Sequence, residues 1–361
     1  MREHSIAVVF GTRPEVVKLA PVVWALGPAA RTIHTGQHYA PALADTLMAE
    51  LGLDPPTLRL TVGGSSRGTQ LGEAIARLDQ AFAAEPPDVV VVQGDTTSAL
   101  AAALAANARA IPLVHVEAGL RSYDRAMPEE HNRIVADHLA DLCCAPTDTS
   151  RAHLAAEGIS GARVVVTGNT VVDAAARMLP DETERAAILE RFGLTHDAFV
   201  LSTFHRPENV DDDARLQVIL RELDALPLPV LLPLHPRTKA RLDASGSDAL
   251  GRVQAVEPLG YRDFLALARE CAFLVSDSGG VQEEASIVKR PVLVVRASTE
   301  RPEVLGTFAE LVPPGRSIGE LGRAWAEDLT AIHARLATLP TPYGDGHAGV
   351  RTVDAIATLS T

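Results

Sequence analysis

The sequence predicts an α/β protein built from two doubly wound, Rossmann-like domains. Short β-branched runs alternate with longer helical patterns, which is typical of parallel sheets covered by helices. This alternation stops at a polar, charged segment, 180–197, and then restarts. The length of 361 residues also exceeds the size at which a single core usually stops growing. We therefore expect two domains with a hinge near 170–182.

The predicted strands are apolar along most of their length, as strands buried on both faces are. They occupy 5–10, 88–93, 112–117 and 163–168, and then 199–204, 229–235, 252–257, 272–277 and 291–296. Amphipathic stretches at 68–84 and 98–108 predict helices between them. In such folds ligands bind beyond the carboxyl ends of the strands, and we expect the site in the cleft between the two domains.

Composition excludes several classes of function. The formal net charge of −13 argues against a nucleic-acid partner. The chain has no 18-residue apolar span and no basic-apolar leader, so we expect a soluble, cytoplasmic protein without a membrane partner. The three cysteines give neither a disulfide framework nor a zinc spacing, and we expect no metal. Neither GxGxxG nor GxxxxGK[ST] follows the first strand, which argues against a tightly bound dinucleotide cofactor.

Charged residues gather where the predicted strands end. The clusters are "GTRPE" (11–15), "GDTTS" (94–98), "EAGLRS" (117–122), "HRPEN" (205–209), "HPR" (235–237) and "SDSGG" (276–280). Turn chemistry alone explains their glycines and prolines. It explains less well why Arg13, Asp95, Glu117, Arg121, His205, Arg206, His235 and Arg237 share one edge. The edge is therefore a candidate site.

The "SDSGGVQEEA" stretch indicates what this edge holds. Backbone N–H groups at a glycine-rich helix start attract anions, whereas the carboxylates of Glu283 and Glu284 suit hydroxyl groups. A ligand with phosphates and sugar hydroxyls matches both.

Several other residues have both a functional and a structural interpretation. Arg13 could fork onto a diphosphate, with Lys18 as a second cation, although Lys18 could also lie on a solvated helix face. Glu129 and Arg133, four residues apart, could form a surface ion pair or join Asp95 and Glu117 in proton chemistry. His205 could screen a departing phosphate oxygen or be structural.

Taken together, "FGTRPEVVKLAP", "GDTTS", "HVEAGLRS", "PEEHNR", "TGNTVVD", "HRPENV", "SDSGGVQEEA" and "TERPE" closely resemble the non-hydrolysing UDP-N-acetylglucosamine 2-epimerases. The resemblance covers nearly the whole chain. It implies a glycosyltransferase-B-like fold and a homodimer. The first domain would be 1–175 and the second, nucleotide-binding domain 176–346, with a final helix in 347–361 packing back on the first.

The resemblance also implies a reaction: reversible C2 epimerisation of UDP-N-acetylglucosamine to UDP-N-acetylmannosamine. UDP would be eliminated to leave 2-acetamidoglucal and then re-added, without a redox cofactor. Asp95, Glu117, Glu129 and Arg133 would carry or support proton transfer. Arg13, Lys18 and His205 would meet the diphosphate and Phe264 the uracil. Ser278, Gly279 and Gly280 would hold phosphate, Glu284 the ribose, and Arg301 the sugar.

The sequence departs from many bacterial members at "QHYAPAL" (37–43). Gln37 and His38 are retained, but Tyr39 and Ala40 stand where long polar side chains would bind a second substrate molecule as activator. We expect weak or absent activation.

Three other functions fit parts of the pattern: a hydrolysing epimerase that releases N-acetylmannosamine, a retaining glycosyltransferase of the same fold, and a non-catalytic nucleotide-sugar sensor. Three carboxylates in the first domain argue against the last two, because neither binding an acceptor nor sensing a sugar needs them.

Overall fold

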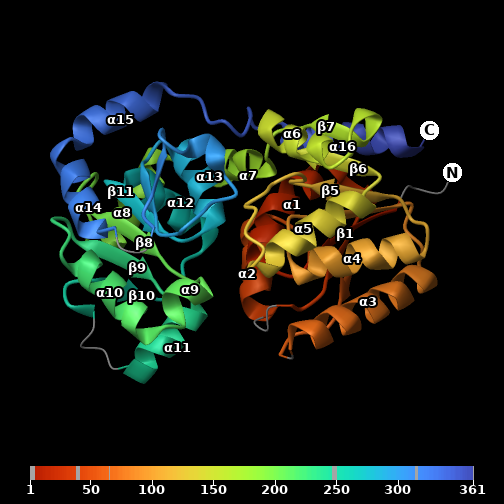
Figure 1. Cartoon of the computed structure of the whole chain (residues 1–361), viewed down its shortest axis with the longest axis horizontal. Coiled ribbons are helices and arrows are strands. Elements are labelled where there is room, and N and C mark those ends of the chain that lie inside the picture. Colours follow the sequence, from red (N-terminus) through yellow and green to blue (C-terminus); the bar gives the residue numbers. More distant parts are fainter. Residues whose placement is uncertain (1–4, 38–40, 65, 246–249, 314–315, 361) are drawn as a thin grey trace. The chain divides into compact units, whose positions relative to one another are not determined.

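The computed structural model of this protein describes residues 5–37, 41–64, 66–245, 250–313 and 316–360. It divides into two compact units, each with its own sheet (Figure 1). The first unit comprises Met1–Arg177 and Tyr343–Thr361, and the second comprises Met178–Pro342. Within the described residues, no helix is long and apolar enough to cross a membrane.

The first unit contains a seven-stranded parallel sheet in the order β3-β2-β1-β4-β5-β6-β7. Its order reverses between β1 and β4, which makes that pair the switch point of the sheet. The strands are β1 (Ile6–Phe10), β2 (Ala30–His34), β3 (Leu58–Arg59), β4 (Val89–Gln93), β5 (Leu113–Val116), β6 (Leu142–Ala145) and β7 (Val164–Val166).

Helices form two groups around this sheet. Helices α3, α4 and α5 pack side by side, and α1 packs against α2 and α16 (Figure 1). The helices of the unit are α1 (Arg13–Leu26), α2 (Pro41–Glu50), α3 (Arg67–Ala84), α4 (Thr97–Ala108), α5 (Pro128–Leu139), α6 (Asp148–Ala156), α7 (Thr170–Met178) and α16 (Ala348–Ala357), with short 3₁₀ turns η1 (Gly27–Ala29), η2 (Gly161–Arg163) and η5 (Thr358–Ser360).

Specific contacts fix the terminal helix α16 to the first unit. The carboxylate of Asp173 accepts hydrogen bonds from the first N–H groups of α16, at 3.1 Å from Ala348 and 2.9 Å from Gly349. Capping of this kind satisfies donors that have no partner within the helix. A Cβ atom at Gly349 would lie 2.7 Å from the Pro21 carbonyl oxygen, so glycine lets α16 approach α1 closely.

The second unit contains a six-stranded parallel sheet in the order β10-β9-β8-β11-β12-β13. Its switch point lies between β8 and β11. The strands are β8 (Val200–Thr203), β9 (Val230–Pro233), β10 (Gln254–Val256), β11 (Phe273–Ser276), β12 (Val292–Val294) and β13 (Ala309–Leu311).

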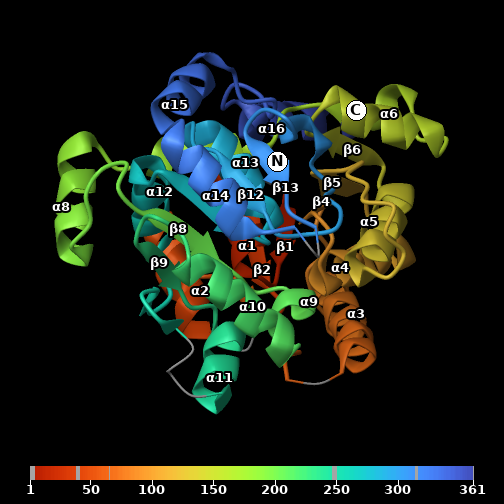
Figure 2. The ribbon, with the colours of Figure 1, turned by 60° about the vertical axis from the view of Figure 1, so that its left-hand side comes forward.

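The helices of the second unit begin with the segment that the sequence marks only as polar and charged. That segment forms α8, which packs against α12 at one side of the unit (Figure 2). The helices are α8 (Glu182–Phe192), α9 (Pro207–Val210), α10 (Asp213–Asp224), α11 (Pro236–Ser245), α12 (Tyr261–Glu270), α13 (Gly279–Val288), α14 (Ile318–Glu327) and α15 (Leu329–Thr338), together with the 3₁₀ turn η4 (Pro302–Val304).

The expected fold class is confirmed, since both sheets are parallel and flanked by helices. Every strand that the sequence predicts is present, within a few residues at its ends. The prediction lacks β2, β3, β6 and β13. β2, β3 and β13 are short or mix polar with apolar residues, as "ARTIH" in β2 does, so no apolar run marks them. β6 ("LCCA") is apolar but only four residues long and without β-branched residues.

The end of α4 offers a test of backbone strain. Ala110 has a φ of 52°, in the left-handed region that a residue with a Cβ atom rarely adopts. Ala110→Gly should therefore stabilise the protein by about 0.5–1 kcal/mol. Ala108, exposed at the last helical position, is the matched control: Ala108→Gly should destabilise by about 0.5–1 kcal/mol. Urea unfolding midpoints measure both, and shifts of the same sign would contradict the strain.

Candidate functional site

The switch point of the first sheet is held together by Glu15. Its Oε2 atom accepts hydrogen bonds from the N–H groups of Gly11 (3.0 Å) and Thr12 (2.8 Å), which follow β1. Its Oε1 atom accepts one from the Thr96 hydroxyl (2.7 Å), which follows β4. Burial raises the pKa of Glu15 to about 7, although these hydrogen bonds act in the opposite direction. The sequence analysis did not single out this residue.

Asp95 follows β4 and pairs with a guanidinium from α5. Arg133 donates to the carboxylates of both Asp95 and Glu130. The Asn132 amide also donates to the Asp95 carbonyl oxygen at 2.8 Å. The sequence allowed a surface ion pair between Glu129 and Arg133. Arg133 instead forms a buried pair with Glu130, because Glu130 faces inward and Glu129 is exposed. Asp95 and Arg133 therefore lie together, with Glu130 as their neighbour.

Glu117 follows β5 and pairs with a lysine from α1. The Lys18 ammonium and the Asn169 amide, at 2.9 Å, both donate to Glu117 Oε2. Lys18 is buried, so the solvated helix face considered for it is wrong. Glu117 itself has a φ of 65°. A non-glycine residue in this region persists only when its surroundings hold it there, and such residues cluster at functional sites.

His205 follows β8, at the switch point of the second sheet. Its Nδ1 atom lies 3.1 Å from Asp277 Oδ1, and the N–H groups of His205 and Arg206 donate to the same carboxylate. Burial acts to raise the pKa of Asp277, but hydrogen bonds from His205 and Asn209 outweigh it and keep that pKa below its ordinary value. The imidazole of His205 remains partly exposed.

The Ser278-Gly279-Gly280 turn follows β11 and begins α13. Ser278 is the N-cap of α13, but its side chain makes no capping hydrogen bond in the described structure. A Cβ atom at Gly279 would lie 2.6 Å from Nη1 of Arg301 and 2.9 Å from Oε1 of Glu300. Glycine therefore leaves room for the Arg301 guanidinium beside the helix start.

A buried charge network holds Arg301 in that position. Arg301 Nε donates to Glu283 Oε1 at 2.8 Å, and its Nη1 atom donates to Glu300. Glu300 also pairs with Arg296 at 2.8 Å and faces Arg206 at 3.6 Å. Burial lowers the pKa of Arg296 below its ordinary value. These pairings hold the Arg301 guanidinium beside the start of α13.

The remaining predicted residues occupy separate places. Arg13 is half-buried at the start of α1, and burial lowers its pKa. Phe264 is half-buried in the first turn of α12, and Glu284 is buried in α13. His38, Tyr39 and Ala40, on which the expected loss of activation depends, lie outside the described residues.

Sequence reasoning missed several members of these clusters. Glu130, Asn169, Asp277 and Glu300 are buried polar residues directly within or beside the quoted motifs. Each follows or flanks a predicted strand or helix start, so position alone could have suggested them. The pattern did not indicate which of two adjacent carboxylates, such as Glu129 and Glu130, turns inward.

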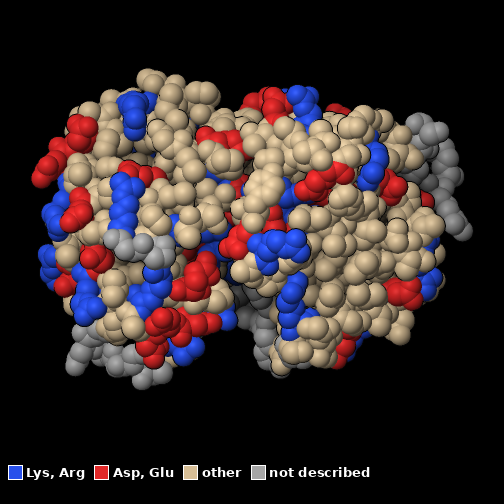
Figure 3. Space-filling model, viewed as in Figure 1, with Lys and Arg blue, Asp and Glu red and all other residues tan. Residues whose placement is uncertain are grey.

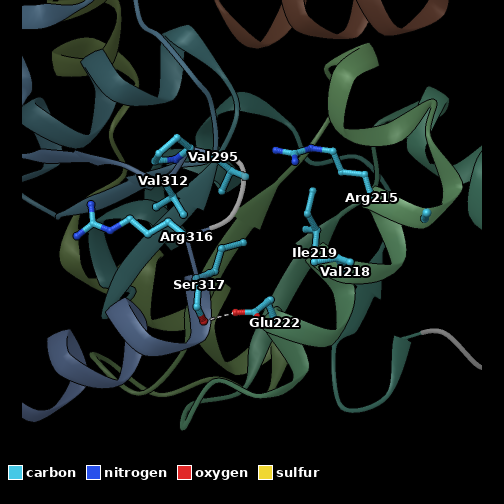
Figure 4. Close-up of a pocket in the computed structure, with 11 residues that line it drawn as sticks. Arg215, Val218, Ile219, Glu222, Val295, Val312, Arg316 and Ser317 are labelled. Carbon is cyan, nitrogen blue, oxygen red and sulfur yellow. Dashed lines mark hydrogen bonds between the residues drawn. The ribbon is translucent and has the colours of Figure 1, made fainter.

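A pocket of about 380 Å³ lies elsewhere in the second unit (Figure 4). It is formed by α10, the start of α14 and the segments after β12 and β13. Ser317 donates to Glu222 there at 2.5 Å, and Arg215 and Arg316 line it. None of the predicted site residues lines this pocket, so it adds nothing to the candidate site.

The distribution of charged and potential metal-binding side chains has two features. Acidic and basic side chains are interspersed on each unit, on the face shown in Figure 3. Among the described residues, no group of three or more His, Cys, Asp or Glu side chains is arranged to hold a metal ion.

Two Rossmann-like units with ionisable residues at both switch points define a protein of the glycosyltransferase-B-like class. The family model described as UDP-N-acetylglucosamine 2-epimerase matches residues 28–357. The chain belongs to this family of isomerases.

Relatives and solved structures agree with this membership. The UDP-N-acetylglucosamine 2-epimerase of Methanocaldococcus jannaschii is 36% identical, over 97% of this chain and 98% of that protein. The enzyme of Bacillus subtilis is 33% identical, over 99% and 96%. The crystal structure of the Neisseria meningitidis enzyme bound to UDP-GlcNAc matches with a TM-score of 0.87 at 31% identity, over 98% of this chain and 100% of that chain.

Glu15 makes the stability of the first unit decrease as pH rises. Its pKa is raised on folding, so the folded state binds more protons than the unfolded state between about pH 4.5 and 7. Its contribution to stability is present below pH 4.5 and is lost as pH rises to 7, by on the order of 3 kcal/mol. Urea unfolding from pH 4.5 to 8 should show a flatter profile for Glu15→Gln than for the wild type. Parallel profiles would contradict the assignment.

Proposed function

We propose that this protein interconverts UDP-N-acetylglucosamine and UDP-N-acetylmannosamine by inversion at C2. Membership of the epimerase family supports this, as do relatives whose crystal structures contain UDP-GlcNAc and UDP. The observation that carries the proposal is the pairing of Asp95 and Glu117, at neighbouring strand ends, with Arg133 and Lys18. Carboxylates placed beside cations can serve as the base or the acid of a proton-transfer step.

The proposed route eliminates UDP and then adds it back. The hydrogen at C2 has no adjacent carbonyl group to acidify it, so its removal must accompany departure of the diphosphate. One of Asp95 and Glu117 takes the C2 proton, the C1–O bond breaks, and UDP leaves with the bonding electrons, giving 2-acetamidoglucal. Re-addition of UDP at C1 and delivery of a proton to the opposite face of C2 complete the inversion. Glu129 and Arg133 would support these transfers.

The second unit would hold the UDP part of the substrate. The first N–H groups of α13 and the nearby Arg301 offer an anion site at Ser278, Gly279 and Gly280. Glu284, one turn further along α13, would accept hydrogen bonds from ribose hydroxyls. His205 would meet the leaving phosphate, Phe264 would stack on uracil, and Arg13 and Lys18 would add cations from the first unit.

The reaction class is better supported than the identity of the sugar. One relative, at 32% identity over 98% of this chain, is named UDP-2,3-diacetamido-2,3-dideoxy-D-glucuronate 2-epimerase. That name describes inversion at the same carbon of a different UDP-sugar. Both substrates therefore belong in the assay. The homodimer and the cytoplasmic location expected from the sequence remain predictions.

Epimerisation in D₂O tests the chemistry. Starting from UDP-N-acetylglucosamine, the UDP-N-acetylmannosamine formed should carry deuterium at C2, because the returned proton comes from solvent-exchanged acids. Proton NMR identifies the products. Asp95→Asn and Glu117→Gln should each reduce turnover by about 10²–10⁴-fold, the usual contribution of general acid–base catalysis.

Three other results would contradict the proposal. Free N-acetylmannosamine would indicate a hydrolysing enzyme, and no conversion of either sugar would indicate a binding protein or a transferase. Protium at C2 after many turnovers would indicate internal hydride transfer.

Gly279 tests the placement of phosphate in the second unit. Gly279→Val should displace the Arg301 guanidinium and weaken UDP binding by about 10- to 100-fold, as loss of a charge-assisted hydrogen bond does. Gly68 is a matched control in the first turn of α3, where a Cβ atom meets nothing within 4 Å. Gly68→Val should keep the wild-type affinity. Equal UDP affinities in calorimetry, with normal thermal unfolding, would overturn the placement.

A further inference from the structure

A buried histidine lies between the two loops that carry Asp95 and Glu117. His115 is in β5, two residues before Glu117, and its side chain is fully buried. Its Nδ1 atom is 2.7 Å from Oδ1 of Asp137, in α5. Its Nε2 atom is 2.7 Å from the carbonyl oxygen of Gly94, the residue before Asp95. The ring therefore contacts one oxygen on each side.

The partners of His115 determine its protonation. A backbone carbonyl oxygen only accepts hydrogen bonds, and an ionised carboxylate does so too. Asp137 also accepts hydrogen bonds from the Arg121 guanidinium (2.8 Å) and from the Gly119 N–H group (3.2 Å), so its carboxylate acts as an acceptor in this network. A neutral ring would direct a lone pair at one of these oxygens. Both ring nitrogens of His115 therefore face oxygens that only accept hydrogen bonds.

The residues around Asp137 are also charged. Asp137 is also paired with Arg121 at 2.8 Å, and Arg121 makes two hydrogen bonds to Glu157, at 2.8 and 2.6 Å. Arg121, the His115 imidazole and two carboxylates thus form a compact, mostly buried set. Burial of such a set costs desolvation energy that close pairing offsets. Removing one member would leave an unpaired buried charge, so the set holds its members in one arrangement.

The same network reaches the loop on the other side of Glu117. Asp137 accepts a hydrogen bond from the N–H group of Gly119, whose nitrogen lies 3.2 Å from Oδ2. Glu117 and Gly119 both have left-handed backbones, with φ of 65° and 83°. A left-handed non-glycine residue costs of order 1–3 kcal/mol and persists only where the surroundings over-determine it. Asp137 and His115 supply part of that constraint.

We propose that His115 is a positioning residue for the epimerase reaction. As a doubly protonated imidazole, it clamps the Gly94 carbonyl to Asp137, and Asp137 in turn fixes the turn at Gly119. The clamp thereby sets the positions of Asp95 and Glu117 relative to each other. This role rests on the proposed function, but the protonation of His115 does not.

Nitrogen NMR of the wild-type protein tests the protonation directly. With ¹⁵N-labelled histidine, the two ring nitrogens of His115 should both show the shifts of an imidazolium at neutral pH. The resonances are assigned by their loss in His115→Phe, or in His115→Gln if the phenylalanine variant does not fold. A neutral tautomer, with one unprotonated nitrogen, would overturn the proposal.

Kinetics of His115→Phe tests the positioning. Phenylalanine keeps an aromatic ring but loses both hydrogen bonds, so kcat should fall by about 10²-fold, the effect of a small misplacement of reacting groups. The affinity for UDP should change far less than kcat, because most of the proposed UDP contacts, including the turn at Ser278, lie in the second unit. The matched control is His333→Phe in the second unit, which loses a hydrogen bond to the Ala272 carbonyl oxygen (2.7 Å) and a contact with the Asp197 carboxylate (3.4 Å). That variant should lose stability but keep kcat.

Failure of the positioning role and failure of the proposed function give different results. A folded His115→Phe variant with kcat within about threefold of the wild type would leave His115 a structural residue and overturn the proposal. If the wild-type protein converts neither UDP-sugar, the proposed function fails. The NMR result then still decides whether the imidazolium clamp exists.

Discussion

Parallel pairing of the strands is the constraint on which the rest of this structure depends. Because all described strands of each sheet run in one direction, their carboxyl ends meet at one edge. Residues far apart in the chain, such as Asp95 and Glu117, are thereby brought to neighbouring strand ends. The crossover at each switch point also separates the helices that follow adjacent strands, which opens space above that edge.

Concentrating charge at these edges carries a desolvation cost that the protein offsets by pairing. Lys18 with Glu117, Arg133 with Glu130, and Arg301 with Glu283 are buried pairs that each join one element to another or fix a helix start. A buried pair of this kind contributes little net stability but strongly disfavours other arrangements once one partner is in place. The charged edges therefore define geometry more than they stabilise the fold.

One strained residue, Glu117, lies at the charged edge of the first sheet. Glu117 has a left-handed backbone between β5 and the buried network of Asp137. The residues that hold this conformation are drawn from β4, β5 and α5, so they cannot relax independently. A general base needs such fixed placement, because proton transfer requires contact at hydrogen-bond distance. The fixed backbone therefore suits the proposed role of Glu117 in proton transfer.

The sequence by itself determined the fold class, most of the strands, and the motifs that identify the family. Apolar runs predict the buried strands. The residues that follow each run can then be identified in the sequence as the residues at the strand's carboxyl end. Tertiary structure decided which member of each motif turns inward. Adjacent Glu129 and Glu130 are indistinguishable in a linear pattern, yet only Glu130 is buried against Arg133. Likewise, Asp277 and His115 act through partners some 70 and 20 residues away in the chain. Such pairings depend on sheet order and helix packing, which local residue patterns do not encode.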